Sequence, residues 1–353
     1  YSANKAIEVG IKTLDLASVC IKIGNQLSQQ GDLDGANSEY ERAWNMGCRS
    51  KDLALKINKL GVDYSSVNRF DEAIENFKKT ILIIPDNCIF HKNLGIIYQR
   101  KGFTMEAIKS FEKGMAIEPK DIKILEKLKE VYKEAGYFTR AIKILEKLLE
   151  LKPKTLQYIF YTGQIYQELG KYKKAAEYYK ETINIKKDWY SPYIELGFIY
   201  LNENNLIEAR QNLEQGYKLN INNPRALIGM GRIYALQREL NLSEEYYSKA
   251  FELYEEEMQK KGVSPDIHLM LGDMHFYRME IDMAIAEYKK ALKIKEEYPS
   301  GALRLGKSLI IIGEILEGER TLKNIAKNDI EFPEVYLYLG DIYRIKGLLQ
   351  EAI

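Results

Sequence analysis

The chain of 353 residues carries 52 Lys and Arg against 51 Asp and Glu, which leaves a formal net charge of +1. This balance lacks the basic surface that binds nucleic acid, so nucleic acid is not an expected partner. No run of 18 apolar residues is present, so no segment is expected to insert directly into a membrane.

A glycine recurs along the chain at nearly constant spacing. The steps are 34 residues from Gly61 to Gly231, with Lys129 in place of glycine once, and again 34 from Gly272 to Gly340. A period of this length, with apolar residues at helical spacing between the glycines, indicates a tandem array of helix pairs.

Each repeat adds large and small residues at fixed distances from its glycine, as the repeat of Gly197 illustrates with Tyr200, Ala209 and Leu213. Glycine within a helix costs about 1 kcal/mol relative to alanine, so a close contact must compensate for it. We expect Gly197 to let Ala209 of the second helix approach. We expect the tyrosine and the Phe or Leu positions to fill the space between successive pairs.

In chain order, residues 1–16 are predicted to be the second helix of a preceding partial repeat. Repeats 1–7 then occupy 17–264, and repeats 8–10 occupy 265–353, the last of them truncated. Neither end carries a polar capping element, which favours a fragment of a longer protein and leaves self-association through the uncapped ends as an alternative. The predicted boundaries are 17–53, 54–87, 88–121, 122–155, 156–189, 190–223, 224–264, 265–298, 299–332 and 333–353.

Two spacings deviate from the period. The step from Gly24 to Gly61 is 37 residues, which places three extra residues in the 46–53 connection. The step from Gly231 to Gly272 is 41, a seven-residue insertion near 255–262. Seven residues are close to two helical turns, so the second helix of repeat 7 is predicted to lengthen. Its charged end is interpreted as a solvated helix terminus, with a docking ridge for a partner as the alternative.

These residues make the chain resemble the tetratricopeptide repeat (TPR) family over residues 17 to 353. The resemblance implies an all-α fold, a right-handed α-solenoid of about ten helix-turn-helix repeats whose first helices line a concave groove for protein or peptide partners. The family pattern is clearest in repeat 3, where it comprises His91, Leu94, Gly95, Tyr98, Ala107, Phe111, Gly114 and Pro119.

Motifs that could carry chemistry are better explained by the repeats. Residues 301–308 fit the spacing of a phosphate-binding loop, but they fall inside a predicted first helix whose backbone amides are already bonded. His268 and His275 lie about 10.5 Å apart by helical rise, too far to share a metal, and with His91 they are interpreted as packed histidines. The sequence therefore predicts no catalytic residues, no metal site, no cofactor and no enzyme activity.

The three cysteines, Cys20, Cys48 and Cys88, do not form a disulfide framework. Cys20 holds a repeat position that is otherwise apolar, so a reduced, buried thiol is expected. This usage favours the cytoplasm, and a periplasmic location stays open if a signal peptide was removed.

The resemblance also implies which residues face the groove. Some TPR domains grip a C-terminal carboxylate with a Lys–Asn–Asn–Lys–Arg clamp. This chain resembles the clamp only in part, at Asn93, Lys123 and Lys127, because Asn58 and Val62 occupy the positions where the clamp needs Lys and Asn. In the middle of the groove, aromatic side chains close to Arg225 and Arg232 suggest a partner segment with an acidic residue. The alternative is that Phe160 and Phe198 simply pack between helices. The predicted partner-binding residues are Asn93, Lys123, Lys127, Phe160, Tyr161, Gln164, Phe198, Arg225, Arg232, Asp273, Arg304 and Lys307.

The leading functional hypothesis is a non-catalytic scaffold that binds partner segments during assembly of a larger complex. Two alternatives remain open at this stage. One is the TPR targeting arm of a longer enzyme, for example a glycosyltransferase, whose catalytic domain is absent. The other is a self-assembling scaffold.

Overall fold

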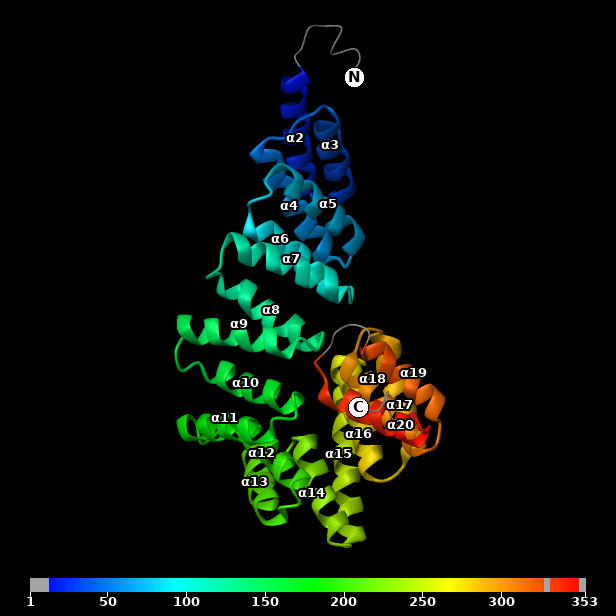
Figure 1. The fold of residues 1–353 in the computed structure, drawn as a ribbon. Helices are drawn as coiled ribbons and strands as arrows, with labels where there is room; N and C mark the ends of the chain where they lie inside the picture. Colours follow the sequence, from blue (N-terminus) through cyan, green and yellow to red (C-terminus); the bar gives the residue numbers. More distant parts are fainter. Residues whose placement is uncertain (1–12, 327–330, 349–353) are drawn as a thin grey trace. The chain divides into compact units, whose positions relative to one another are not determined.

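The computed structural model describes residues 13–326 and 331–348, and within these ranges it contains 19 α-helices and no strand (Figure 1). Contacts divide the chain into an N-terminal unit, residues 1–131, and a C-terminal unit, residues 132–353. Each unit is described separately. The all-α fold expected from the glycine period is confirmed.

In the N-terminal unit, successive helices form helix-turn-helix pairs, and each pair packs against the next. Helix α8 contains the boundary between the two units. The helices are α2 (Thr13–Gln29), α3 (Leu33–Asn45), α4 (Lys51–Ser66), α5 (Phe70–Ile83), α6 (Cys88–Arg100), α7 (Thr104–Ile117) and α8 (Ile122–Glu134).

The C-terminal unit continues the same arrangement, in which the first helix of each repeat also contacts the first helix of the next in several places. Its helices are α9 (Phe138–Leu151), α10 (Leu156–Glu168), α11 (Tyr172–Ile185), α12 (Tyr190–Asn202), α13 (Leu206–Leu219), α14 (Pro224–Leu236), α15 (Leu240–Lys261), α16 (Pro265–Tyr277), α17 (Ile281–Ile294), α18 (Pro299–Ile311), α19 (Ile315–Ala326) and α20 (Pro333–Ile345).

Local sequence explains where the helices begin and end. Pro224 and Pro265 begin α14 and α16, where the missing proline N–H leaves no hydrogen bond unmade. Side chains of Asn223 and Ser264 accept hydrogen bonds from the first turns of the same two helices. The turn after α10 contains Gly170 at φ +68°, a left-handed conformation that glycine adopts without steric cost.

The repeat glycine lies directly beside a large side chain of the second helix. A Cβ atom on Gly197 would lie 2.5 Å from Cγ of Leu213, and one on Gly163 would lie 2.7 Å from the Tyr179 ring. The glycine therefore makes room for the large residue sixteen positions later in the same helix pair. The small residue twelve positions later also lies close in an equivalent repeat, since a Cβ atom on Gly24 would lie 3.2 Å from the carbonyl oxygen of Ala36. The expected approach of Ala209 to Gly197 stays a prediction.

The deviating spacings appear as longer helices. Helix α15 has 22 residues and ends at Gly262, at φ +84°. Its charged end forms exposed ion pairs between Glu256 and Lys260 and between Glu257 and Lys261. Near the other deviation, α4 begins at Lys51 and has 16 residues. The extra residues thus extend helices that already belong to the repeats.

The ends of the chain are only partly described. Helix α2 begins at Thr13, so residues 13–16 belong to the first helix of repeat 1. Residues 1–12, expected to form a preceding helix, lie outside the described residues, as do residues 349–353 of the last repeat. Cys20 and Cys48 are buried and all three cysteines are free thiols. Of the helices that are described, none has the length and apolar character needed to cross a membrane.

Candidate functional site

The predicted groove residues fall in both units and are considered separately. In the N-terminal unit, the Asn93 side chain donates a hydrogen bond to Oδ1 of Asn58 at 3.0 Å. Lys127 forms an ion pair with Glu130 on its own helix at 2.8 Å, and Lys123 is exposed. Two of the three clamp-like side chains are therefore already engaged within the protein.

In the C-terminal unit, Arg225 belongs to a hydrogen-bonded network between α10, α11, α12 and α14. Its guanidinium donates to Glu195 at 2.9 Å and lies 4.7 Å from the centre of the Phe198 ring. Glu195 also accepts from Gln167 at 3.2 Å, and Gln167 accepts from the Tyr179 hydroxyl at 2.8 Å. The charge of Arg225 is thus neutralised inside the protein.

The two aromatic residues predicted beside this network pack against neighbouring helices. Phe198 is only 7% exposed, with the Arg225 guanidinium over its ring. The Phe160 ring lies 5.4 Å from Tyr179 and 4.8 Å from Trp189. These contacts match the packing alternative for both rings. Tyr161 lies under the Lys133 ammonium group at 5.0 Å, and Gln164 is half-buried.

Arg304 and Asp273 form a second neutralised pair, between α18 and α16. The Arg304 Nε lies 2.8 Å and 3.1 Å from the two carboxylate oxygens of Asp273. The Tyr288 hydroxyl donates to the same carboxylate at 2.9 Å. Burial and the negative charge of Asp273 raise the pKa of Tyr288 far above its usual value, so this hydroxyl stays a donor.

Arg232 and Lys307 differ from these two arginines, because in the described part of the chain neither lies within ion-pair distance of a carboxylate. The Arg232 guanidinium lies 4.4 Å from the Tyr277 ring centre and donates to the amide oxygen of Asn202 at 3.2 Å. The Lys307 ammonium lies 5.0 Å from the Phe276 ring and 5.7 Å from the Tyr338 ring.

These two cations flank a single pair of rings. Phe276 and Tyr277 are adjacent in α16, and their ring centres are 6.1 Å apart in an edge-to-face arrangement. Lys307 lies against the first ring and Arg232 against the second. The arrangement joins residues of α14, α16 and α18 and places each of the two positive charges against the π-electron density of a ring.

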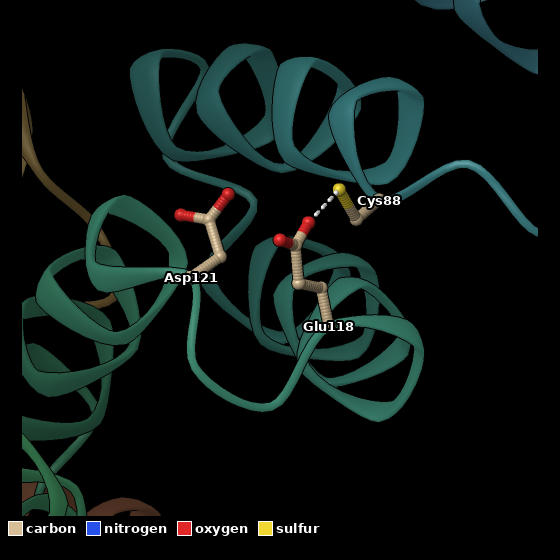
Figure 2. Close-up of side chains that lie close together, drawn as sticks. All are labelled: Cys88, Glu118 and Asp121. Carbon is tan, nitrogen blue, oxygen red and sulfur yellow. Dashed lines mark hydrogen bonds between the residues drawn. The ribbon is translucent and has the colours of Figure 1, made fainter.

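A separate cluster in the N-terminal unit brings together Cys88, Glu118 and Asp121, whose candidate ligand atoms lie within 4.8 Å of one another (Figure 2). The Cys88 thiol donates to Glu118 at 3.0 Å, and burial and the Glu118 carboxylate raise the pKa of Cys88 to about 11. Asp121 accepts from the Ile124 amide at the start of α8. Each group thus has a local structural role, and a protonated thiol is a poor metal ligand.

The histidines have hydrogen-bond partners of their own. Nδ1 of His268 lies 2.6 Å from Glu287, Nδ1 of His275 lies 2.7 Å from Glu280, and Nε2 of His91 lies 2.8 Å from a backbone oxygen. Residues 301–308 lie within α18, so their backbone cannot fold around a phosphate.

Comparison with known proteins identifies the repeat. Two family models, both described as tetratricopeptide repeat, match residues 130–192 and 224–257. No match was found among curated proteins.

The chain is also similar to several solved structures. A tetratricopeptide repeat protein from Parabacteroides merdae has a TM-score of 0.55 at 17% identity, covering 72% of this chain and 98% of that one. PilF of Pseudomonas aeruginosa has a TM-score of 0.45 at 18% identity, covering 59% and 97%. The Cut9–Hcn1 hetero-tetramer of the APC/C has a TM-score of 0.48 at 15% identity, covering 95% and 78%. The two family matches identify tetratricopeptide repeats within residues 130–192 and 224–257, and the recurring helix pairs and the glycine period support a tetratricopeptide repeat protein.

Proposed function

We propose that the protein is a non-catalytic scaffold that binds a segment of a partner protein along the first helices of its C-terminal unit. The partner segment presents two acidic side chains, one to Arg232 and one to Lys307. The observation that carries this proposal is that these two cations, on either side of the Phe276–Tyr277 ring pair, have no carboxylate partner among the described residues.

The proposal assigns the other two predicted cations a different role. Arg225 and Arg304 are already paired with Glu195 and Asp273, so a partner carboxylate gains little from them. Arg232 offers a planar fork that binds a carboxylate through two hydrogen bonds, and Lys307 offers a compact charge. The neighbouring rings hold both cations in place through cation–π contacts.

The pattern of charge favours a peptide over a long polyanion. The ninth residue of each successive first helix from α14 onward alternates in sign, as Arg232, Asp273, Lys307 and Asp341. A nucleic acid would place phosphates against carboxylates at every second repeat. A peptide can place acidic side chains at the two cations and neutral ones elsewhere.

A peptide-display selection on the purified protein tests the proposal. We expect the enriched peptides to contain at least two Asp or Glu residues, and their affinity to fall about tenfold or more with Arg232→Ala and Lys307→Ala together. Raising the salt concentration should weaken binding by the parent protein more than binding by the double variant.

The matched control replaces two exposed lysines on second helices, Lys173→Ala and Lys293→Ala, which removes the same net charge. This control should bind the selected peptides as the parent does. Enriched peptides without acidic residues, or equal losses in both double variants, would show that the two cations do not form the recognition site.

A further inference from the structure

The residues that lead into α20 contact a distant part of the C-terminal unit. The Glu331 amide donates a hydrogen bond to the carbonyl oxygen of Gly136 at 3.0 Å. In return, the Thr139 amide donates to the Glu331 carboxylate at 2.5 Å, across 192 residues of sequence. A residue at the end of repeat 9, just before α20, is thus bonded to the turn and first residues of α9 in repeat 4.

Two further contacts continue from the same segment. The ring centres of Phe332 and Phe138 are 4.8 Å apart in an edge-to-face arrangement, and both residues are buried. The Tyr172 hydroxyl at the start of α11 donates to Glu334 at 3.3 Å. Burial and the Glu334 charge raise the pKa of Tyr172 to about 12, so this hydroxyl remains a donor.

An ion pair one repeat earlier reaches the same region independently. Lys295, in the connection between α17 and α18, lies 2.9 Å from the carboxylate of Glu134 at the end of α8. Two successive connections between repeats, at Lys295 and at Glu331, therefore contact the α8–α9 region.

The start of α9 is suited to hold an acidic residue. The first amides of any helix have no acceptor within the helix, and a carboxylate there gains both a hydrogen bond and a favourable interaction with the helix dipole. Helix α9 has no side-chain cap from its own N-cap residue, Tyr137. Glu331 supplies the missing acceptor.

We propose that residues 331–334 form a latch that reversibly ties repeats 9 and 10 to repeats 4 and 5. In a solenoid each repeat otherwise contacts only its neighbours, so its curvature follows from many small interfaces. The latch adds a contact between repeats far apart in the array and fixes the curvature of the C-terminal unit. It opens without unfolding any helix, because it consists of a few side-chain and turn contacts. This property goes beyond partner binding and needs no partner for its test.

Hydrogen exchange of one amide reports directly on the latch. Lys173 holds in α11 the position that Thr139 holds in α9, and its amide has no acceptor among the described residues. After correction for intrinsic rates, the Thr139 amide should exchange about tenfold or more slowly than the Lys173 amide. Glu331→Ala should bring the two rates to within about twofold while the helical circular dichroism is retained.

A matched control is available one repeat earlier. Glu297-Tyr298-Pro299 occupies the same position before α18 as Glu331-Phe332-Pro333 before α20, and Glu297 is exposed. Glu297→Ala should leave Thr139 protection unchanged. Lys295→Glu should weaken the protection, and adding Glu134→Lys should restore it by rebuilding the ion pair with reversed charges.

Distances between spin labels test the effect on curvature. The C-terminal unit has no native cysteine, so labels can be placed at Lys180→Cys on α11 and Leu316→Cys on α19 after Cys20, Cys48 and Cys88 are replaced by alanine. We expect one narrow distance distribution that broadens with Glu331→Ala and not with Glu297→Ala.

Three outcomes would overturn the latch. One is equal exchange of the Thr139 and Lys173 amides in the parent protein. The second is a distance distribution unaffected by Glu331→Ala. The third is Thr139 protection that disappears on dilution, which would place the contact between two copies of the chain.

Discussion

The packing of the repeat glycines can be tested at Gly163, where the available space is best defined. An alanine Cβ there would lie 2.7 Å and 2.9 Å from two carbons of the Tyr179 ring. Tyr179 is fully buried, and its hydroxyl donates to Gln167, which itself donates to Glu195. The ring therefore cannot move away without disturbing the network that neutralises Arg225.

The expected magnitude follows from opposing contributions. Overpacking a buried site costs about 1–3 kcal/mol. Weakening the Tyr179 hydrogen bond adds about 0.5–1.5 kcal/mol. Replacing glycine by alanine in a helix stabilises the folded state by about 1 kcal/mol through the higher helix propensity of alanine. We therefore expect Gly163→Ala to lower the free energy of unfolding of this region by about 1–3 kcal/mol.

Urea denaturation followed by circular dichroism, with hydrogen exchange to locate the affected repeats, measures this effect. Gly301→Ala serves as the control, since its Cβ would lie 3.2 Å from a ring carbon of half-buried Tyr298 and at ordinary contact distances of 3.5 Å and 3.7 Å from Leu292 and Leu269. The control should change stability by less than about 1 kcal/mol. If Gly163→Ala were as stable as the parent or more stable, the glycine would not be required by the Tyr179 ring.

Three other substitutions probe the remaining contacts. Glu195→Gln should lower the free energy of unfolding of the C-terminal unit by about 1–3 kcal/mol, because it removes the charged partner of Arg225. A smaller loss of stability in the double variant Glu195→Gln with Arg225→Leu would confirm that the unpaired charge is the cause, and equal losses would contradict it. Glu257→Ala should lower the free energy of unfolding, measured by thermal denaturation, by less than about 1 kcal/mol, because its ion pair with Lys261 lies on the exposed end of α15. A larger loss of stability would indicate that Glu257 has a packing role. Because the pKa of Cys88 is raised from 9.0 to about 11, the protonated thiol favours the folded state below pH 9 and that contribution is lost as the pH rises toward 11. The rate of alkylation of Cys88 should therefore rise between pH 9 and pH 11. Glu118→Gln should shift the midpoint of this rate-against-pH curve to lower pH, and an unchanged midpoint would show that Glu118 does not raise the pKa of Cys88.

The sequence predicted the helices well because their signals are local. Glycine at the turns, proline at the first position and apolar residues at helical spacing each act within one repeat, and the repetition of the pattern removes the ambiguity of any single match. At Gly197 the sequence predicts that the second helix approaches closely, and the packed helices show that Leu213 is the nearest side chain.

The candidate site was predictable only as a set of positions. The family resemblance placed Arg225, Arg232, Arg304 and Lys307 on first helices, but the sequence does not show which of them have a carboxylate partner. Glu195 and Asp273 lie about 30 residues from the arginines that they neutralise, and only the packed helices bring them together. The cluster of Cys88, Glu118 and Asp121 likewise forms only because the two ends of repeat 3 lie side by side in the fold.

The repeat, its helix pairs and the residues at equivalent positions follow from the sequence, because these depend on contacts within about 40 residues. The tertiary structure shows which charges are compensated within the protein, because ion pairing depends on distances between successive repeats. It also decided that Glu331 caps α9. That contact joins residues 192 positions apart, and no local period records which distant turn will lie beside a given helix end.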